Sequence, residues 1–128
     1  MIRMRQLGIA VLMAVASLAS PAWPRLPHSQ RKTVVDNKPV RLRHITGVIV
    51  DQKGLFIAYP AVELRDANDH HVIATSFADG NGHFHFEDRK PGEQLEIRFS
   101  MKGYQPVQYT IDVVRIGHTK MKAVMPPA

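Results

Sequence analysis

The sequence predicts an all-β domain, a sandwich of seven antiparallel strands. From Arg41 onward, apolar residues recur with a period of two, as they do in strands that bury one face. Clusters of Asp, Asn, Gly and Pro interrupt this pattern about every 8–12 residues, the spacing typical of short strands joined by turns. No stretch has the sustained 3.6-residue period of an amphipathic helix. A two-layer antiparallel sandwich is the simplest arrangement with these properties.

Residues 1–22 have the three parts of a cleavable signal peptide. Two arginines near the start supply positive charge, residues 7–19 are uncharged and mostly apolar, and Ser20-Pro21-Ala22 supplies the small residues that signal peptidase recognises. We expect cleavage after Ala22. The apolar run is shorter than the roughly 20 residues of a membrane helix, so an uncleaved anchor and a buried core helix are the less favoured alternatives. The mature protein is therefore expected to be secreted or periplasmic, with no stable membrane span.

Residues 23–40 predict a disordered basic linker. They contain three prolines and four bases and show no apolar periodicity. The segment is either a spacer or a basic arm that contacts anionic lipid or cell-wall polymer. The folded domain is expected to span residues 41–128.

The positive charge of the chain lies mainly outside the expected domain. The net charge is +6, but residues 23–43 hold six bases against one acid, whereas nine bases and ten acids follow from His44 onward. A nucleic-acid-binding domain would carry its basic stripe on the fold, so nucleic acid is not an expected partner. The chain has no cysteine, so its domain is stabilised without disulfides and it carries no cysteine-linked lipid anchor.

The first three strands are expected at 41–50, 61–66 and 72–78. The first ends at the turn 51–54, where the Asp51 side chain caps the turn and Gly54 adopts a positive φ. In the second, Val62 and Leu64 point inward while the charged residues between them point outward. The turn 68–70 then leads into the third strand.

Four further strands are expected at 83–86, 94–100, 107–114 and 118–124. Residues 79–82 (Asp-Gly-Asn-Gly) form a strong hairpin turn, and the Pro-Gly pair at 91–92 has the order of a type II turn. The last strand alternates lysines outward with Met121 and Ala123 inward. The expected core consists of Ile45, Val48, Val50, Val62, Leu64, Phe77, Phe84, Phe86, Leu95, Ile97, Phe99, Tyr104, Val107, Tyr109, Ile111 and Val124.

Five segments together resemble the carboxypeptidase regulatory-like family. Residues 46–54 resemble its opening G-x-V-x-D-x-x-G, 59–64 its P-x-x-V-x-L strand, and 78–86 its T-D-x-x-G-x-F-x-F, with Ala78 in place of Thr. Pro-Gly at 91–92 matches P-G-x-Y without the aromatic residue, and 102–104 matches x-G-Y. The motif residues are Gly47, Asp51, Gly54, Asp79, Gly82, Pro91, Gly92, Gly103 and Tyr104.

The resemblance spans residues 44–125 and concerns turn-forming and core positions. It implies a Greek-key, prealbumin-like (transthyretin-like) sandwich of seven antiparallel strands, most often from a bacterium, and it implies no active site. The sequence also lacks a cysteine nucleophile, a Gly-x-Ser-x-Gly elbow and a phosphate loop. We therefore expect an exported non-catalytic module without a cofactor, for binding or structural support in the cell envelope. Its partner would be another envelope or secreted protein, or a glycan.

A histidine-based metal site is the alternative function. His83 and His85 are two residues apart on an expected strand, so both side chains point to one face, a spacing that suits two ligands of zinc or copper. His70 and His71, in the preceding loop, are candidates to join them. Polar residues on the solvent-facing side of a sheet are the favoured explanation of the pair, so no metal is expected. The 79–82 turn is too short for a calcium loop.

Two other features of the expected surface suggest binding. Arg98, Lys102, Lys120 and Lys122 form either an ordinary solvated surface or a patch for an anionic glycan. An exposed sheet edge is the second route, because it can accept a strand from a partner.

Overall fold

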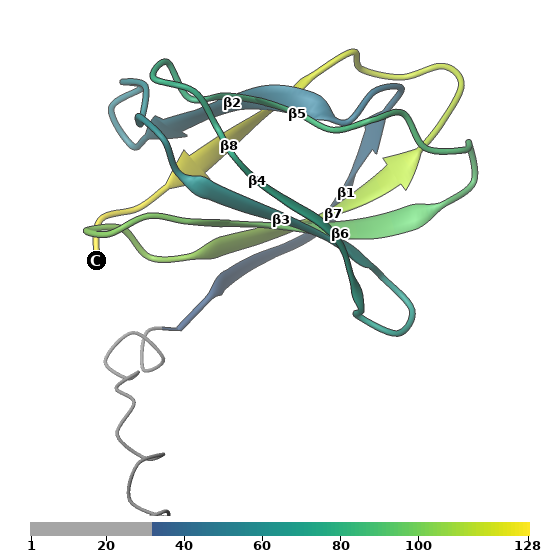
Figure 1. Cartoon of the computed structure of the whole chain (residues 1–128), viewed down its shortest axis with the longest axis horizontal. Coiled ribbons are helices and arrows are strands. Elements are labelled where there is room, and N and C mark those ends of the chain that lie inside the picture. The colour runs from purple at the N-terminus through teal and green to yellow at the C-terminus, as the bar shows by residue number, and fades with distance from the viewer. Residues whose placement is uncertain (1–31) are drawn as a thin grey trace, which may run out of the picture. The chain divides into compact units, whose positions relative to one another are not determined.

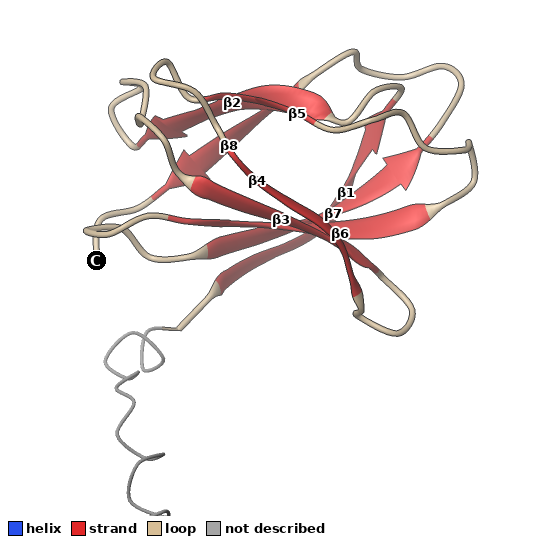
Figure 2. Cartoon of the chain, in the orientation of Figure 1, coloured by secondary structure: helices blue, strands red, loops and turns tan. Residues whose placement is uncertain are grey.

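The structure, a computed structural model, describes residues 32–128, and every regular element among them is a β-strand (Figure 2). The predicted signal peptide and residues 23–31 lie outside this part. A helix long and apolar enough to cross a membrane is not found within residues 32–128. The strands are β1 (Val34–Leu42), β2 (Thr46–Asp51), β3 (Ala61–Asp66), β4 (Val72–Phe77), β5 (His83–His85), β6 (Gln94–Ser100), β7 (Val107–Val113) and β8 (Met121–Met125).

Five strands form the larger of two sheets, in the order β1-β7-β6-β3-β4. β3 pairs antiparallel with both β4 and β6, and β6 pairs antiparallel with β7. β1 runs parallel to β7, from the pair Val34–Val107 to the pair Leu42–Val113. The strands β1 and β4 are therefore the two edges of this sheet.

The smaller sheet has three strands in the order β5-β2-β8 and forms the second layer of the sandwich (Figure 1). β2 pairs antiparallel with β5 and parallel with β8. Gly47 on β2 lies opposite Met121 on β8, and a side chain at Gly47 would collide with the carbonyl oxygen of Met121. The motif glycine at 47 therefore allows close strand pairing.

The all-β sandwich is confirmed, but the structure corrects the prediction of seven strands that are all antiparallel. Within residues 32–128, eight strands form two mixed sheets, each with one parallel pair. The predicted strand 41–50 is divided: Leu42 ends β1 in the larger sheet and Thr46 begins β2 in the smaller one. Parallel pairs join strands that are distant in the sequence, without a connecting tight turn. Turn signals consequently give no indication of them.

Strand β1 begins inside the segment that was expected to be a disordered linker. Most of its side chains are exposed, so the strand shows little apolar pattern. Its register with β7 shifts between Asp36 and Val40, around Pro39, which has no N–H to donate to a ladder. β1 depends on backbone pairing with β7 more than on buried side chains, and composition alone does not reveal such a strand.

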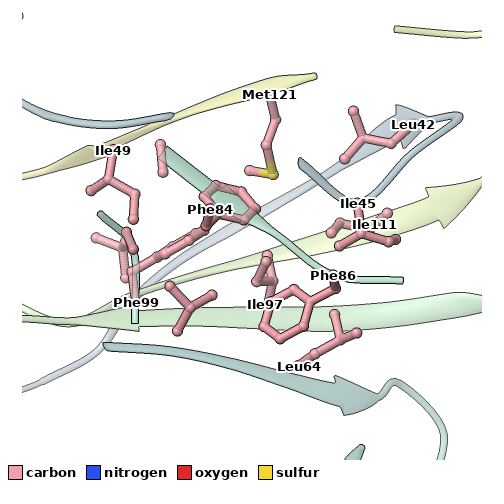
Figure 3. Close-up of a cluster of buried hydrophobic side chains, with 14 of the residues drawn as sticks. Leu42, Ile45, Ile49, Leu64, Phe84, Phe86, Ile97, Phe99, Ile111 and Met121 are labelled. Atoms are coloured by element: carbon pink, nitrogen blue, oxygen red, sulfur yellow. The ribbon is translucent and has the colours of Figure 1, made fainter. Parts of the chain in front are cut away.

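The core lies between the two sheets, with Phe84 of β5 at its centre. The rings of Phe84 and Phe99 are 5.1 Å apart, and Figure 3 shows Phe84 between Met121 and Phe99. The predicted core residues that are buried are Ile45, Val50, Val62, Leu64, Phe84, Phe86, Leu95, Ile97, Phe99, Val107 and Ile111. Buried residues that were not predicted include Leu42, Ile49, Ile57, Val113 and Met125.

Phe77 and Val124 were predicted to be in the core and are exposed, with 73% and 38% of their surface accessible. Phe77 lies opposite Ala61 on the outer face of β4, whereas its neighbour Ala78 is buried. Val124 alternates with the buried residues of β8 and so points outward. The other predicted core residues, Val48, Tyr104 and Tyr109, are half-buried.

Candidate functional site

The turn after β2 is organised by the carboxylate of Asp51. Its Oδ1 accepts the backbone N–H groups of Lys53 (2.8 Å) and Leu55 (2.9 Å), and its carbonyl oxygen accepts that of Gly54 (3.0 Å). Gly54 has a φ of 86°. The predicted capping role of Asp51 and the predicted positive φ of Gly54 are both confirmed.

The turn between β4 and β5 is built in the same way around Asp79. Its Oδ1 accepts the N–H groups of Asn81 (2.8 Å) and His83 (2.9 Å). The backbone N–H of His83, followed by that of Asn81, lowers the pKa of Asp79 below its usual value. Gly82 has a φ of 77°, and a Cβ there would lie 2.5 Å from the carbonyl oxygen of Ile49. Two rigid Asp-capped turns therefore lie at the same end of the sandwich.

Three large apolar side chains are exposed beside these turns. Leu55, Phe56 and Tyr59 have 63%, 60% and 63% of their surface accessible. The ring of Phe56 lies 6.2 Å from that of His83. Tyr59 has a φ of 59°, and its N–H donates to the carbonyl oxygen of Asp79 (3.0 Å). We call the group Leu55, Phe56, Tyr59 and His83 the aromatic end.

Buried residues fix the loop that carries the aromatic end. The N–H of Ile57, which is 4% exposed, donates to the carbonyl oxygen of Ile49 (3.1 Å). Pro60 is fully buried, and its carbonyl oxygen accepts the N–H of Ala78 (2.9 Å). The loop is thus anchored to the core through Ile57 and Pro60, so packing and hydrogen bonds position its exposed residues.

The sequence analysis missed the aromatic end. Leu55, Phe56 and Tyr59 lie between two predicted strands, where neither the period of two nor a turn motif marks them. The available signal was an apolar group, Leu-Phe-Ile-Ala-Tyr at residues 55–59, placed where a solvent-facing loop was expected. Clustered exposed apolar residues are typical of binding surfaces.

The four candidate metal-binding histidines are not brought together. His83 and His85 do share the exposed face of β5, as predicted. His70 and His71 lie in the turn between β3 and β4, whereas the Asp79 turn follows the far end of β4. Strand β4 separates the two groups. The Nδ1 atoms of His70 and His71 are already bonded to Glu96 (3.0 Å) and Asp69 (2.6 Å).

Among residues 32–128, one group of side chains has the spacing of a metal site: Asp66, Asp69 and His71, whose ligand atoms lie within 4.8 Å of one another. The backbone N–H of His71, and then its side chain, lower the pKa of Asp69. Asp66 accepts the N–H of Asn68 (2.7 Å) and Asp69 accepts that of His71 (3.0 Å). These contacts explain the cluster as a turn, because its carboxylates cap the backbone.

The four basic residues considered as an alternative glycan patch lie on different parts of the fold. Arg98 lies on β6 of the larger sheet, where its guanidinium donates to Gln108 (3.2 Å), whereas Lys122 lies on β8 of the smaller sheet. Lys120 immediately precedes β8, and Lys102 lies in the loop after β6. The four charges are therefore divided between two sheets and two loops.

The remaining motif residues shape two other turns. Gly92 follows Pro91 with a φ of 100°, and the N–H of Glu93 donates to the carbonyl oxygen of Lys90 (3.2 Å), as a type II turn requires. Gly103 has a φ of 92°. The adjacent Tyr104 forms an isolated bridge with Pro127.

A polar hollow of about 990 Å³ lies at the end of the sandwich opposite the aromatic end. Its charged side chains are largely paired with neighbours: Arg89 donates to Glu93 (2.9 Å), and Gln94 donates to Asp112 (3.0 Å). Size alone would favour this hollow. We favour the aromatic end, because its apolar side chains are exposed and unusual on a surface, whereas the hollow is lined by ordinary paired charges.

Comparisons with known proteins give little beyond the fold. No family model matches the chain, and no curated protein matches its sequence. A solved structure, 3-chlorocatechol 1,2-dioxygenase from Rhodococcus opacus 1CP, matches with a TM-score of 0.49 and 14% identity, over 91% of this chain and 77% of that one. The resemblance to the carboxypeptidase regulatory-like family stays a prediction.

The expectation that the protein is not an enzyme is corrected by this comparison, since the similar structure is that of an enzyme. The low identity and TM-score assign no activity, substrate or metal to the chain.

Proposed function

We propose that this protein is an exported β-sandwich module that binds, or structurally supports, a component of the cell envelope through its aromatic end. The partner is a glycan or another envelope or secreted protein. The signal-type sequence at residues 1–22 supports export to the periplasm or the medium. The five motif segments support a carboxypeptidase regulatory-like, prealbumin-like domain.

The observation that carries the proposal is the exposure of Leu55, Phe56 and Tyr59 on one loop that is hydrogen-bonded to both Asp51 and Asp79. Exposure of large apolar groups to water is unfavourable, so a partner that covers them gains binding free energy from their burial. Tyrosine and phenylalanine bring large contact areas with few rotatable bonds, and such residues are frequent in binding centres. The Asp-capped turns limit the entropy that binding would cost.

The polar groups around the aromatic end suit a partner with both apolar and hydroxyl surfaces. Asp79 is an ionised acceptor, and the imidazole of His83 stands beside the ring of Phe56. A sugar ring presents a C–H face that stacks on an aromatic side chain and a rim of hydroxyls that hydrogen-bond. An exposed protein loop combines the same two kinds of surface.

Binding is tested with purified peptidoglycan sacculi and the full-length chain in a co-sedimentation assay. Phe56→Ala combined with Tyr59→Ala is expected to weaken binding at least tenfold, which is about 1.4 kcal/mol. Ile116→Ala is the matched control, because Ile116 is 87% exposed in the loop that follows β7 at the opposite end. Equal binding by the double variant and the control would refute the aromatic end as the binding site.

The nature of the partner is resolved by treating the sacculi with a protease. Binding that survives the treatment assigns a glycan, and binding that disappears assigns an attached protein. No binding to either preparation would contradict an envelope ligand of these classes.

Export is tested separately, by determining the N-terminus of the protein recovered from the cell. Cleavage after Ala22 gives a mature chain that begins at Trp23. Recovery of the intact chain in the cytosol would refute the export part of the proposal, whatever the aromatic end binds.

A further inference from the structure

The two sheets have four edges, and three of them carry features that prevent further strand pairing. β1 contains Pro39 and a shift of register. β5 is only three residues long. β8 contains Lys122, and the N–H of Val124 on β8 is occupied by the hydroxyl of Tyr109 (3.0 Å). Prolines, irregular pairing, short strands and lysines are the common protections of sheet edges.

β4 is the least protected of the four edges: its one irregularity is the register shift opposite Leu64 and Arg65 near its start, beyond which residues 74–77 pair regularly with β3. Its sequence, Val-Ile-Ala-Thr-Ser-Phe, contains no charge and no proline, and three of its six residues are β-branched. Among the strands that the structure describes, it pairs only with β3. Val72 and Phe77, at its two ends, are 48% and 73% exposed. This is the one edge among residues 32–128 with the composition of an interior strand.

The backbone of β4 directs hydrogen-bonding groups away from β3. The N–H of Ala78 donates to the carbonyl oxygen of Pro60 (2.9 Å), so Ala78 faces β3. In an antiparallel ladder, residues alternate between facing one neighbour and facing the other. Thr75 and Phe77 therefore turn their N–H and C=O groups to the open side of β4, where a further strand would pair. The carbonyl oxygen of Phe77 accepts a long hydrogen bond from the Ser76 hydroxyl (3.4 Å), which a pairing strand would replace.

We propose that β4 accepts an extended segment of a partner protein as the sixth strand of the larger sheet. Charge identifies the segment. Asp69 precedes β4 and Asp79 follows it, and hydrogen bonds lower the pKa of both, so both are ionised at neutral pH. The complementary segment has an uncharged, β-branched centre and a basic residue at each end.

A second copy of this chain is a poorer occupant. Antiparallel pairing of β4 with itself would bring Asp69 of one copy towards Asp79 of the other, and parallel pairing would align each carboxylate with its equivalent. Like charges placed opposite one another destabilise paired strands. The flanking aspartates therefore select a basic partner against self-association.

Small side chains leave room beside part of β4. On the inner face, Ala74 and Ser76 lie opposite Leu64 and Val62 and are small. A strand added at the usual spacing of about 4.8 Å would meet these small side chains over residues 74–76, and the larger Ile73, which packs against the core, near the start of β4.

The test uses the full-length chain and a fluorescent peptide, Arg-Thr-Val-Thr-Val-Thr-Val-Arg, with blocked ends. We expect saturable binding by anisotropy and slower hydrogen exchange of the Thr75 and Phe77 amides. A peptide with glutamate at both ends, and one N-methylated at alternate residues, are expected to bind at least tenfold more weakly. The first lacks the charge complement and the second lacks the strand donors.

Two β4 variants separate this edge from the rest of the surface. Thr75→Pro removes an outward N–H, and Thr75→Lys adds the charge typical of protected edges. Each is expected to weaken peptide binding at least tenfold, while Val35→Lys on the β1 edge leaves it unchanged. Thermal melts identify variants that fail to fold. If Thr75→Pro does not fold, Thr75→Lys alone tests the edge.

The proposal is overturned by absence of peptide binding, by equal binding of the glutamate-ended peptide, or by equal effects of Thr75→Lys and Val35→Lys. A dimer that dissociates on Thr75→Lys would also overturn it, because the occupant of β4 would then be a second copy. Failure at the aromatic end leaves these outcomes unaffected, since the variants and the probe differ.

Discussion

The phenol oxygen of Tyr109 on β7 accepts a hydrogen bond from the backbone N–H of Val124 on β8, at 3.0 Å. This contact joins the larger sheet to the open edge of the smaller one. The aromatic ring of Tyr109 also packs edge-on against Phe99, with 6.1 Å between the ring centroids. One side chain thus contributes to the core and supplies a partner for a strand edge.

Replacing Tyr109 with Phe keeps the ring and removes that hydrogen bond. We expect a loss of about 0.5–1.5 kcal/mol in the free energy of unfolding, the usual contribution of such a bond. Urea denaturation measures it. Tyr59→Phe is the control, because the Tyr59 side chain is exposed. Equal stability of the two variants would show that the Tyr109 hydroxyl contributes nothing to the joining of the sheets.

Phe84 and Phe77 make a matched pair for the core. Phe84 is 4% exposed and contacts Phe99, whereas Phe77 is 73% exposed. Phe84→Ala is expected to cost about 3–5 kcal/mol through lost burial and a cavity. Phe77→Ala is expected to stay within about 0.5 kcal/mol of the parent. Thermal or chemical denaturation that ranks the two variants in the reverse order would contradict the observed faces of β4 and β5.

The comparison of Phe84 with Phe77 also shows how far the sequence determines this fold. Local features were predictable: β3 and β6 have the expected bounds, and Asp51 and Asp79 cap the expected turns. Phe77 was misplaced because the alternation fixes two faces without fixing which is buried. A shift of one residue exchanges them.

Long-range pairing was not predictable from the same patterns. The parallel pairing of Val34 with Val107 joins two segments that are distant in the sequence. Nothing in the sequence of either segment indicates that it pairs with the other. The aromatic end has a similar explanation. Phe56 and His83 come from two turns that meet only because β2 and β5 are paired.

Stability should fall on acidification partly through Asp79. Its pKa is lowered in the folded state by the N–H groups of His83 and Asn81, so folding favours the carboxylate over the protonated acid. This contribution is complete above the ordinary aspartate pKa of 3.8 and is lost as the pH falls through the lower, folded-state pKa.

Asp79→Asn keeps an oxygen acceptor and removes the charge that titrates. We expect the melting temperature of this variant to change less than that of the parent between about pH 5 and pH 2. Glu87→Gln, at an exposed carboxylate in the loop after β5, controls for the loss of one acid. Parallel pH profiles for the parent and Asp79→Asn would show that the turn does not couple folding to protonation.

Gly47 tests the close pairing of β2 with β8. A methyl group at this position would meet the carbonyl oxygen of Met121 and its side chain, and the backbone contact cannot be relieved by a change of rotamer. We expect Gly47→Ala to destabilise the protein by about 1–3 kcal/mol, the usual cost of overpacking. Gly80→Ala is the control, because its Cβ would approach only the hydroxyl end of the exposed Tyr59, at 3.1 Å. If the two variants unfold at the same denaturant concentration, the parallel register of β2 and β8 is not the one described, because that register alone places Met121 against residue 47.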